Sequence, residues 1–421
     1  MIRLRPLHTV GLVDNCWQGV LAGLLVLSLA MTAPAAENAA GTDAWPMFRG
    51  TPSGSGQSLV TLRLPLSEHW QQRFTDCSFT ATPVVAENRI YLGDLNGRFL
   101  ALALETGKTL WEFNSPDSGF PAAAAISTQT DEPLVVVGDD LGTLRAFDSQ
   151  TGALRWSVTT DGEISGGPTI LMDHDPPVVL VGSQDATLLC LELASGKTIW
   201  SHEIADQIRC SPTVGHAPAG PRVFLAGCDG SLHVIDALTG AAVTAIPLGG
   251  PTGTTPAVLG SQVFFGTEGG RFFAVNFVDG VVDWQQQPAA SAPAYRASAA
   301  VAEGVVVVGS RGRVLEAFAT SDGSRLWRQP FAGRLDASPI MLQAIPAAAA
   351  AAAPVPVVLA ADAAGRIAML RLADGIPCWE FDAGGSFVGS PAVVANHLLL
   401  ANEDGTIWCF HSAAVHDDET E

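Results

Sequence analysis

Four residues placed just ahead of strand-like segments carry side chains suited to binding chemistry. Arg209, Tyr295, Arg296 and Asp336 each precede a short step of small residues that leads into an apolar run. Guanidinium groups bind carboxylates through charge-assisted, often paired hydrogen bonds. Arg209 and Arg296 could therefore hold an anionic group such as a peptide carboxyl terminus, with Tyr295 and Asp336 beside it. In the alternative interpretation, Arg209, Arg296 and Asp336 only pair with one another.

The sequence lacks the common motifs of metalloproteases, serine hydrolases and P-loop nucleotide-binding proteins. HExxH, GxSxG and GxxxxGK[ST] do not occur, and the nine histidines are scattered singly. Asp173 and Asp175 share one loop, but two carboxylates supply too few of the six to eight oxygens that calcium requires. We therefore assign no catalytic or metal-binding residue, and the sequence favours a protein that is not an enzyme.

The charge balance excludes nucleic-acid binding, and the amino terminus indicates export. The 421 residues include 22 Lys+Arg and 42 Asp+Glu, for a net charge of −20, and no basic stretch occurs. Nucleic-acid affinity depends on clustered cations. Two arginines precede an apolar run over residues 20–31, and Ala33 and Ala35 follow it as small residues at a cleavage site. We expect a signal peptide over residues 1–36 and a periplasmic or secreted chain without a membrane span. An uncleaved anchor is the alternative, and no cysteine at the cleavage site indicates a lipoprotein.

The cysteines leave two interpretations open. Six remain after the expected signal peptide, and none belongs to a CxxC motif or to an adjacent pair. An even number in an oxidising compartment permits disulfides, in 15 possible pairings. Isolated cysteines in apolar strands are more often small buried hydrophobic residues. The six are Cys77, Cys190, Cys210, Cys228, Cys378 and Cys409.

An eleven-residue pattern occurs seven times and defines the architecture. Its glycines are Gly107, Gly152, Gly196, Gly240, Gly280, Gly323 and Gly375, at intervals of 40 to 52 residues. Such a period is typical of propeller blades or helical solenoids. Each unit contains apolar bursts and alternating strands separated by NG, DG, GG, TG or SG turns, without helical periodicity. The pattern predicts an all-β propeller whose blades have four antiparallel strands.

The two ends of the repeat region predict how the ring closes. Residues 389–411 form an eighth unit that lacks its last strand, and residues 69–74 resemble the outer strand of the sixth unit. Pairing the two removes free sheet edges and gives eight blades. We therefore expect a lead segment over residues 37–67, a monomeric propeller over 68–413 and an acidic disordered tail over 414–421. An alanine-rich insert over 345–356 predicts a protruding loop or short helix.

Each position that recurs between the repeats has a structural explanation. The glycine supplies a left-handed turn, and the tryptophan is expected to pack flat on a turn of the neighbouring blade. The fourth unit has Thr244 in place of the tryptophan, so we expect looser packing there. The expected docking tryptophans are Trp70, Trp111, Trp156, Trp200, Trp284, Trp327 and Trp379.

The pattern A-x-D-x-x-T-G-x-x-x-W, complete at residues 146–156, resembles the tryptophan-docking motif of pyrroloquinoline quinone (PQQ)-like propellers. That family holds eight-bladed quinoprotein dehydrogenases and noncatalytic members such as the β-barrel assembly lipoprotein BamB. The resemblance covers residues 68–411, and the WPMFRG segment at 45–50 looks like the entry segment of such proteins. Fold implies function only weakly.

The resemblance implies two alternative functions. Quinoprotein dehydrogenases carry an adjacent cysteine pair over the quinone and a calcium-bound aspartate; this sequence lacks the pair, and its blade region has only about 340 residues. We therefore expect a BamB-like platform that binds cell-envelope proteins, without a cofactor. The alternative is a PQQ-dependent oxidoreductase that holds PQQ and calcium in the central channel, with Arg209 and Arg296 on the quinone carboxylates.

Overall fold

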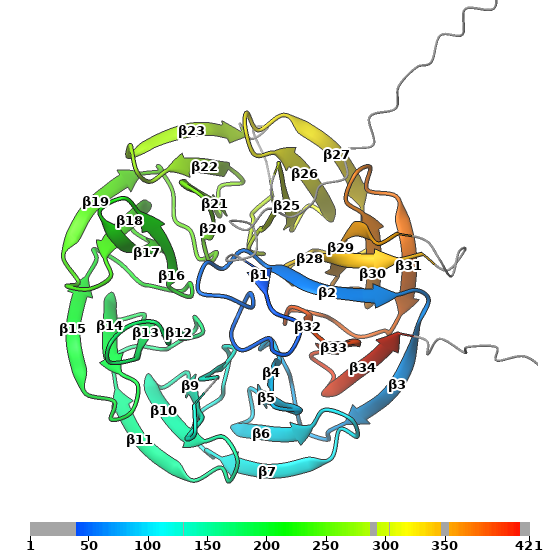
Figure 1. Ribbon diagram of the computed structural model, residues 1–421, viewed down its shortest axis with the longest axis horizontal. Coiled ribbons are helices and arrows are strands. Elements are labelled where there is room, and N and C mark those ends of the chain that lie inside the picture. The colour runs from blue at the N-terminus through cyan, green and yellow to red at the C-terminus, as the bar shows by residue number, and fades with distance from the viewer. Residues whose placement is uncertain (1–38, 129, 287–292, 303, 347–352, 413–421) are drawn as a thin grey trace, which may run out of the picture. The chain divides into compact units, whose positions relative to one another are not determined.

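A computed structural model describes residues 39–128, 130–286, 293–302, 304–346 and 353–412. Contacts divide the chain into the units Met1–Thr32 and Ala33–Glu421, and every described residue lies in the second. The expected signal peptide and acidic tail fall outside the described residues, as do residues 347–352, half of the alanine-rich insert. All regular elements of the described residues are strands, and they form eight sheets arranged in a ring (Figure 1). The predicted all-β, eight-bladed propeller is confirmed.

The blades follow one another along the chain, each running from an inner strand to an outer strand. The first four are β4 to β7 (Val84–Ala86, Arg89–Gly93, Arg98–Ala103, Thr109–Asn114), β8 to β11 (Ala125–Ile126, Leu134–Gly138, Thr143–Asp148, Leu154–Thr159), β12 to β15 (Thr169–Leu171, Val178–Gly182, Thr187–Glu192, Thr198–Glu203) and β16 to β19 (Thr213–Ala217, Gly220–Ala226, Ser231–Asp236, Ala242–Pro247). The next two are β20 to β23 (Ala257–Leu259, Gln262–Gly266, Phe272–Asn276, Val281–Gln286) and β24 to β27 (Ala300–Ala302, Val305–Ser310, Val314–Ala319, Arg325–Pro330). The seventh is β28 to β31 (Ile340–Ile345, Val355–Ala361, Arg366–Arg371, Pro377–Asp382).

The eighth blade is completed by a strand from the amino-terminal part of the chain. Its strands β32 (Ala392–Val394), β33 (His397–Ala401) and β34 (Thr406–Ser412) are joined by β3 (Leu66–Arg73), which pairs antiparallel with β34. The register runs from Leu66 opposite Ser412 to Arg73 opposite Thr406. The strand predicted over residues 69–74 therefore closes the ring as expected and removes two free edges.

The pattern glycine and aspartate build the turn between the third and fourth strands of a blade. In the second blade, Gly152 has a φ of +74° and donates its amide to the Asp148 carbonyl at 2.9 Å. The Asp148 carboxylate accepts hydrogen bonds from the amide and hydroxyl of Thr151, both at 2.8 Å. Arg155 forms an ion pair with the same carboxylate at 2.7 Å. This turn presents its outer surface to the tryptophan of the preceding blade.

The tryptophans connect each blade to the next. Six of the indoles lie over the pattern glycine of the following blade, and their Nε1 groups donate to the carbonyl three residues before that glycine. Six such bonds measure 2.7–3.2 Å, and they join Trp70 to Leu104, Trp111 to Ser149, Trp156 to Leu193, Trp200 to Ala237, Trp284 to Thr320 and Trp327 to Leu372. Trp379 donates instead to the Leu66 carbonyl at 3.3 Å, on the closing strand. Gly280, which follows Thr244 in this order, has nothing within 4 Å of the place where a Cβ would lie.

The lead segment crosses the centre of the ring at one end of the channel (Figure 1). Its backbone groups bond to the inner regions of seven blades, through partners at Val85, Ile126, Val214, Val258, Val301, Met341 and Ala395 at 2.6–2.9 Å. It then forms β2 (Gln57–Arg63), which pairs parallel with β28, and β1 (Ala39–Ala40) pairs parallel with β2. The lead is therefore part of the seventh blade as well as a central connector.

Candidate functional site

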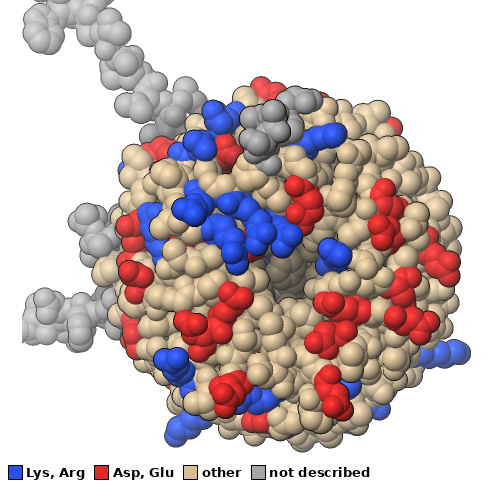
Figure 2. Space-filling model, turned by 180° about the vertical axis from the view of Figure 1, so that it is seen from behind, with Lys and Arg blue, Asp and Glu red and all other residues tan. Residues whose placement is uncertain are grey.

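A cavity of about 200 Å³ lies on the ring axis, where the first strands of the blades begin. Figure 2 shows the hollow from the end opposite the lead, which we call the mouth. Small side chains line most of its wall, and Phe48 of the lead contributes the one aromatic ring. The lining residues are Phe48, Thr80, Ala81, Thr82, Pro121, Ala122, Ala123, Ser165, Gly166, Gly167, Arg209, Ser211, Gly253, Thr255, Arg296, Ser298, Asp336, Ser338, Val388 and Ser390.

A ladder of hydroxyl-to-amide hydrogen bonds runs around this wall. The hydroxyl oxygen of one blade accepts the backbone N–H of the preceding blade at 2.9–3.0 Å, in five successive steps. The residues in order are Ser211, Thr255, Ser298, Ser338, Ser390 and Thr82. Ala123 and Gly167 hold the same position in the second and third blades and have no hydroxyl. The small residues expected ahead of the inner strands therefore hold neighbouring blades together.

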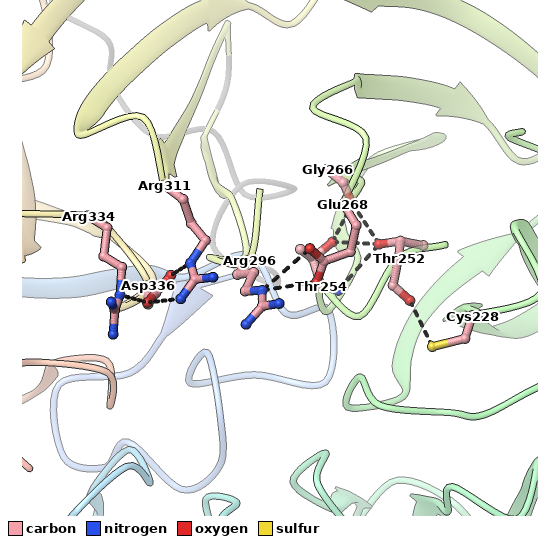
Figure 3. Close-up of polar contacts among 9 residues, drawn as sticks. All are labelled: Cys228, Thr252, Thr254, Gly266, Glu268, Arg296, Arg311, Arg334 and Asp336. Carbon is pink, nitrogen blue, oxygen red and sulfur yellow. Dashed lines mark hydrogen bonds and ion pairs between the residues drawn. The ribbon is translucent and has the colours of Figure 1, made fainter. Parts of the chain in front are cut away.

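The charged residues singled out from the sequence meet different partners at the mouth. Arg209 donates from Nε and Nη2 to the Gln207 Oε1 at 2.9 and 2.6 Å. Arg296 forms an ion pair with Glu268 at 3.0 Å. Figure 3 shows the Arg296 and Asp336 contacts, which come from neighbouring loops. None of the contacts among the described residues joins Arg209, Arg296 and Asp336 to one another.

Asp336 is held between two arginines that the sequence analysis did not single out. Arg311 reaches Oδ1 at 3.0 Å and Arg334 reaches Oδ2 at 2.6 Å, so both carboxylate oxygens are engaged (Figure 3). Arg311 comes from the hairpin between β25 and β26, and Arg334 stands two residues before Asp336. Their role depends on how two loops meet, and neither residue stands out in the repeat pattern. Arg209, Arg296, Arg311 and Arg334 are called the mouth arginines below.

Tyr295 lies apart from the cavity, in the interior of its blade. Its ring packs on Phe272 with the centroids 5.6 Å apart, and its side chain covers Gly266. Its hydroxyl donates toward the Glu316 carboxylate at 3.5 Å. Burial raises the pKa of the Tyr295 phenol. The structure thus brings together Arg209, Arg296 and Asp336 but places Tyr295 behind them.

The mouth is electrostatically uneven. Figure 2 shows Lys and Arg side chains gathered on one side of the opening, with Asp and Glu around the remainder. Arg296 and Arg334 each expose about half of the side chain, at 51% and 46%. In a chain with a net charge of −20, this gathering of guanidinium groups is the most distinctive charge feature of the mouth.

One buried arginine lies in the lead segment. Arg49 is 1% exposed, and its Nη2 donates to the Ala299 carbonyl at 2.7 Å. Its Nε and Nη1 have no partner among the described residues. Burial lowers the pKa of Arg49 to about 9. Its guanidinium occupies the space that a Cβ at Gly56 would need, and Gly56 also has a φ of +64°, which favours glycine. The arginine thus fixes the course of the lead across the channel.

The six described cysteines are all free thiols, so the alternative of a disulfide framework finds no pair among them. Cys190, Cys210 and Cys409 are buried, as expected for small apolar residues in strands. Burial raises the pKa of Cys190 and Cys210 to about 12. Cys228 points its Sγ at the Thr252 carbonyl, 3.8 Å away (Figure 3).

Helices of the length and apolar character needed to cross a bilayer are absent from the part of the chain that the structure describes.

Comparisons with known proteins agree with this architecture. The solved structure of BamB from Moraxella catarrhalis superimposes with a TM-score of 0.62 and 18% identity, covering 82% of this chain and 100% of that one. The computationally designed Ika8 protein gives a TM-score of 0.63 and 16% identity, covering 82% and 99%. Identities this low show the fold alone.

Sequence comparison adds the family. Quinohemoprotein alcohol dehydrogenase ADH IIB of Pseudomonas putida is 28% identical over 93 residues, which span 21% of this chain and 13% of that enzyme. The family model described as outer membrane protein assembly factor BamB matches residues 66–205 and 184–410, and these ranges run through all eight blades. The chain therefore belongs to the PQQ-repeat family of outer membrane protein assembly factor BamB.

Proposed function

We propose that this propeller is a noncatalytic docking platform of the cell envelope that takes part in outer-membrane protein assembly. The observations that carry the proposal are the gathering of Lys and Arg side chains on one side of the channel opening (Figure 2) and the neighbouring positions of Arg296, Arg311 and Arg334 (Figure 3). Membership of a family described by outer membrane protein assembly factor BamB supplies the biological setting. The export signal expected over residues 1–36 would deliver the chain to that compartment.

The mouth arginines have the properties of a protein-binding surface. Arginine is enriched at the energetic centres of interfaces because its planar group combines charge, directional donors and apolar surface. Arg311 and Arg334 share the single carboxylate of Asp336, so donors remain for a partner after the internal bonds are made. The acidic remainder of the mouth repels a uniformly acidic partner. A protein with an acidic segment flanked by neutral or basic residues fits this distribution, and the charge would steer its approach.

A PQQ-dependent oxidoreductase is supported less well by the same residues. Calcium needs six to eight oxygen ligands, and Asp336, the only carboxylate among the described residues that line the cavity, has both oxygens bound by arginines. Five of the wall hydroxyl oxygens already accept amide hydrogen bonds, those of Thr82, Thr255, Ser298, Ser338 and Ser390. The lining residues therefore do not fit a calcium-bound quinone, and we derive no reaction step through one.

The proposal is tested by deleting the gene in the source organism and quantifying β-barrel proteins in purified outer membranes. We expect the deletion to lower their amount and the wild-type gene to restore it. A variant with Arg296→Glu, Arg311→Glu and Arg334→Glu should fail to restore it while still folding by circular dichroism. Lys197→Glu, which reverses an exposed cation in the outer turn between β14 and β15, is the control and should restore it fully. Normal outer membranes in the deletion strain would refute the assembly role.

The quinone alternative has its own test. Purified protein is titrated with PQQ and calcium while the quinone absorbance and dye-linked turnover of alcohols are recorded. A saturable absorbance shift together with turnover, both abolished by Arg209→Ala with Arg296→Ala, would replace the platform proposal with an oxidoreductase. The platform proposal expects neither signal.

A further inference from the structure

The point where the ring closes gathers three histidines and one glutamate from three different parts of the chain. Trp70 of β3 docks on the first blade through the Leu104 carbonyl and Gly107. His69 precedes Trp70, and Glu105 follows Leu104, so this docking brings the two side chains together. Their Nε2 and Oε2 atoms lie 3.5 Å apart.

The eighth blade adds two more imidazoles. His397 of β33 places its Nε2 3.7 Å from the same Glu105 Oε2. His411 of β34 lies opposite His397 in the sheet, and its ring is 4.7 Å from that of His69 between centroids. The His69 and His397 rings are 5.5 Å apart. The cluster therefore joins the closing strand, the last blade and a turn of the first blade.

The hydrogen bonding of His397 is incomplete. Its side chain is only 5% exposed, and Nδ1 has no partner among the described residues. Its Nε2 faces the Glu105 carboxylate at a distance too long for a hydrogen bond. A buried imidazole without a hydrogen-bond partner is costly unless another group satisfies it.

We propose that His69, Glu105 and His397 form a binding site for a divalent transition-metal ion of the zinc type. One ligand atom from each residue lies within 4.8 Å of the others. Zinc binds imidazole nitrogen and carboxylate oxygen at about 2.0–2.2 Å, which places tetrahedral ligand atoms about 3.3–3.5 Å apart. The separations of 3.5 and 3.7 Å require only small side-chain movements. Two imidazoles and one carboxylate suit zinc and its neighbours better than calcium or magnesium.

Binding replaces one existing contact. His69 Nε2 now lies 3.0 Å from the Glu105 carbonyl, and on metal binding its lone pair would turn to the ion with the proton on Nδ1. His411 packs against the His69 ring with the two ring planes tilted by 34°, and it is assigned no ligand role. Three protein ligands leave a coordination position for water.

The combination of a histidine and a glutamate occurs where Trp70 docks on the first blade and does not recur where the later tryptophans dock. At the next step the equivalent positions hold Leu110 and Gln150, which cannot bind a metal in this way. An ion bound here would connect the amino-terminal strand to blades at both ends of the repeat array. Since the site exists only in the closed ring, the metal would stabilise the folded chain over the unfolded chain.

The experiment uses the full folded chain after removal of metals with EDTA. Zinc is titrated by calorimetry, and cobalt is titrated as a spectroscopic probe of the coordination sphere. We expect one equivalent of zinc to bind, the thermal midpoint to rise, and cobalt to give visible absorption bands. Glu105→Gln and His69→Gln should each weaken zinc affinity at least tenfold and abolish the cobalt bands.

His202→Gln is the matched control, because His202 is also a single histidine on an outer strand, 2.9 Å from the Gly240 carbonyl. It should leave zinc affinity unchanged. No zinc binding by the wild type at 100-fold molar excess would overturn the proposal, as would equal zinc affinity in all three variants. Glu105 is 60% exposed, so Glu105→Gln keeps the test decisive even if His69→Gln folds poorly.

Discussion

The indole of Trp200 lies so close over Gly240 that a Cβ at that glycine would come within 2.6 Å of the ring. Gly280, at the same pattern position one blade further, has open space instead, because Thr244 replaces the tryptophan. The two glycines have nearly equal φ values of +72° and +70°. The pair therefore separates the cost of a left-handed backbone from the cost of crowding the indole.

Gly240→Ala should destabilise the fold more than Gly280→Ala. Both substitutions place a Cβ in the left-handed region, at a cost of about 1 kcal/mol. Gly240→Ala also pushes the indole of Trp200 away, which adds about 1–3 kcal/mol as an overpacking cost. Urea unfolding of the two variants measures the difference, and equal losses would contradict the packing role assigned to the indole.

Thr244→Trp should stabilise the protein. The new indole would cover Gly280 and could donate to the Phe277 carbonyl, which stands three residues before that glycine as in the other blades. Burying part of an aromatic ring gives about 1–2 kcal/mol. The gain should shrink when Gly280→Ala is combined with it. An unchanged urea midpoint for Thr244→Trp would show that the open space is too small or too wet to hold the ring.

Ser298→Ala should weaken the ring from the inside. Its hydroxyl accepts the Thr255 amide at 3.0 Å, and both residues are buried. Removing the acceptor leaves a buried N–H without a partner, at a cost of about 1–3 kcal/mol. Ser201→Ala, on an exposed outer-strand position, is the control and should change the unfolding free energy little. Similar values for both variants would mean that water replaces the lost hydroxyl.

Asp148 should make the stability of the folded chain decrease at low pH. The hydrogen bond from Arg155, supported by those from Thr151, lowers the pKa of Asp148 from its usual 3.8 to about 2 in the folded chain. The stabilisation is therefore present above about pH 4 and is lost as the pH falls through 2. Asp148→Asn should lower the thermal midpoint at pH 6 and have a smaller effect near pH 2. The exposed Asp117→Asn serves as control, and a midpoint difference independent of pH would disprove this assignment.

The repeat made most of the fold predictable from the sequence. Positions such as Gly152 and Trp156 recur because every blade has the same local turn, and a spare strand at one end must pair with a gap at the other. The site was less accessible, because it is built by contacts between blades. Asp336 was identified from its position, but its partners Arg311 and Arg334 depend on loop conformations that no period encodes. Tyr295, which the sequence analysis placed at the site, lies outside the cavity because its side chain packs over Gly266.

Part of the histidine cluster could have been predicted from the repeat pattern. The docking of Trp70 on Gly107 places His69 near Glu105 by counting residues alone. His397 requires the register of β33 against β34, which the sequence does not state. The path of the lead was equally inaccessible, since its backbone bonds to seven blades leave no side-chain signature beyond the buried Arg49.

The path of the lead across the ring affects how quickly proteases can degrade the protein. The two termini of a repeat array are where local opening and protease attack usually start. Here the lead is bound to seven of the eight blades, and β3, which follows it, is a strand of the last blade. Detaching the amino-terminal part of the chain must therefore break contacts around most of the ring. Such long-range contacts raise the barrier to unfolding and favour slow spontaneous opening. Where proteases are present, the lifetime of the protein should therefore be set by the rate at which it opens.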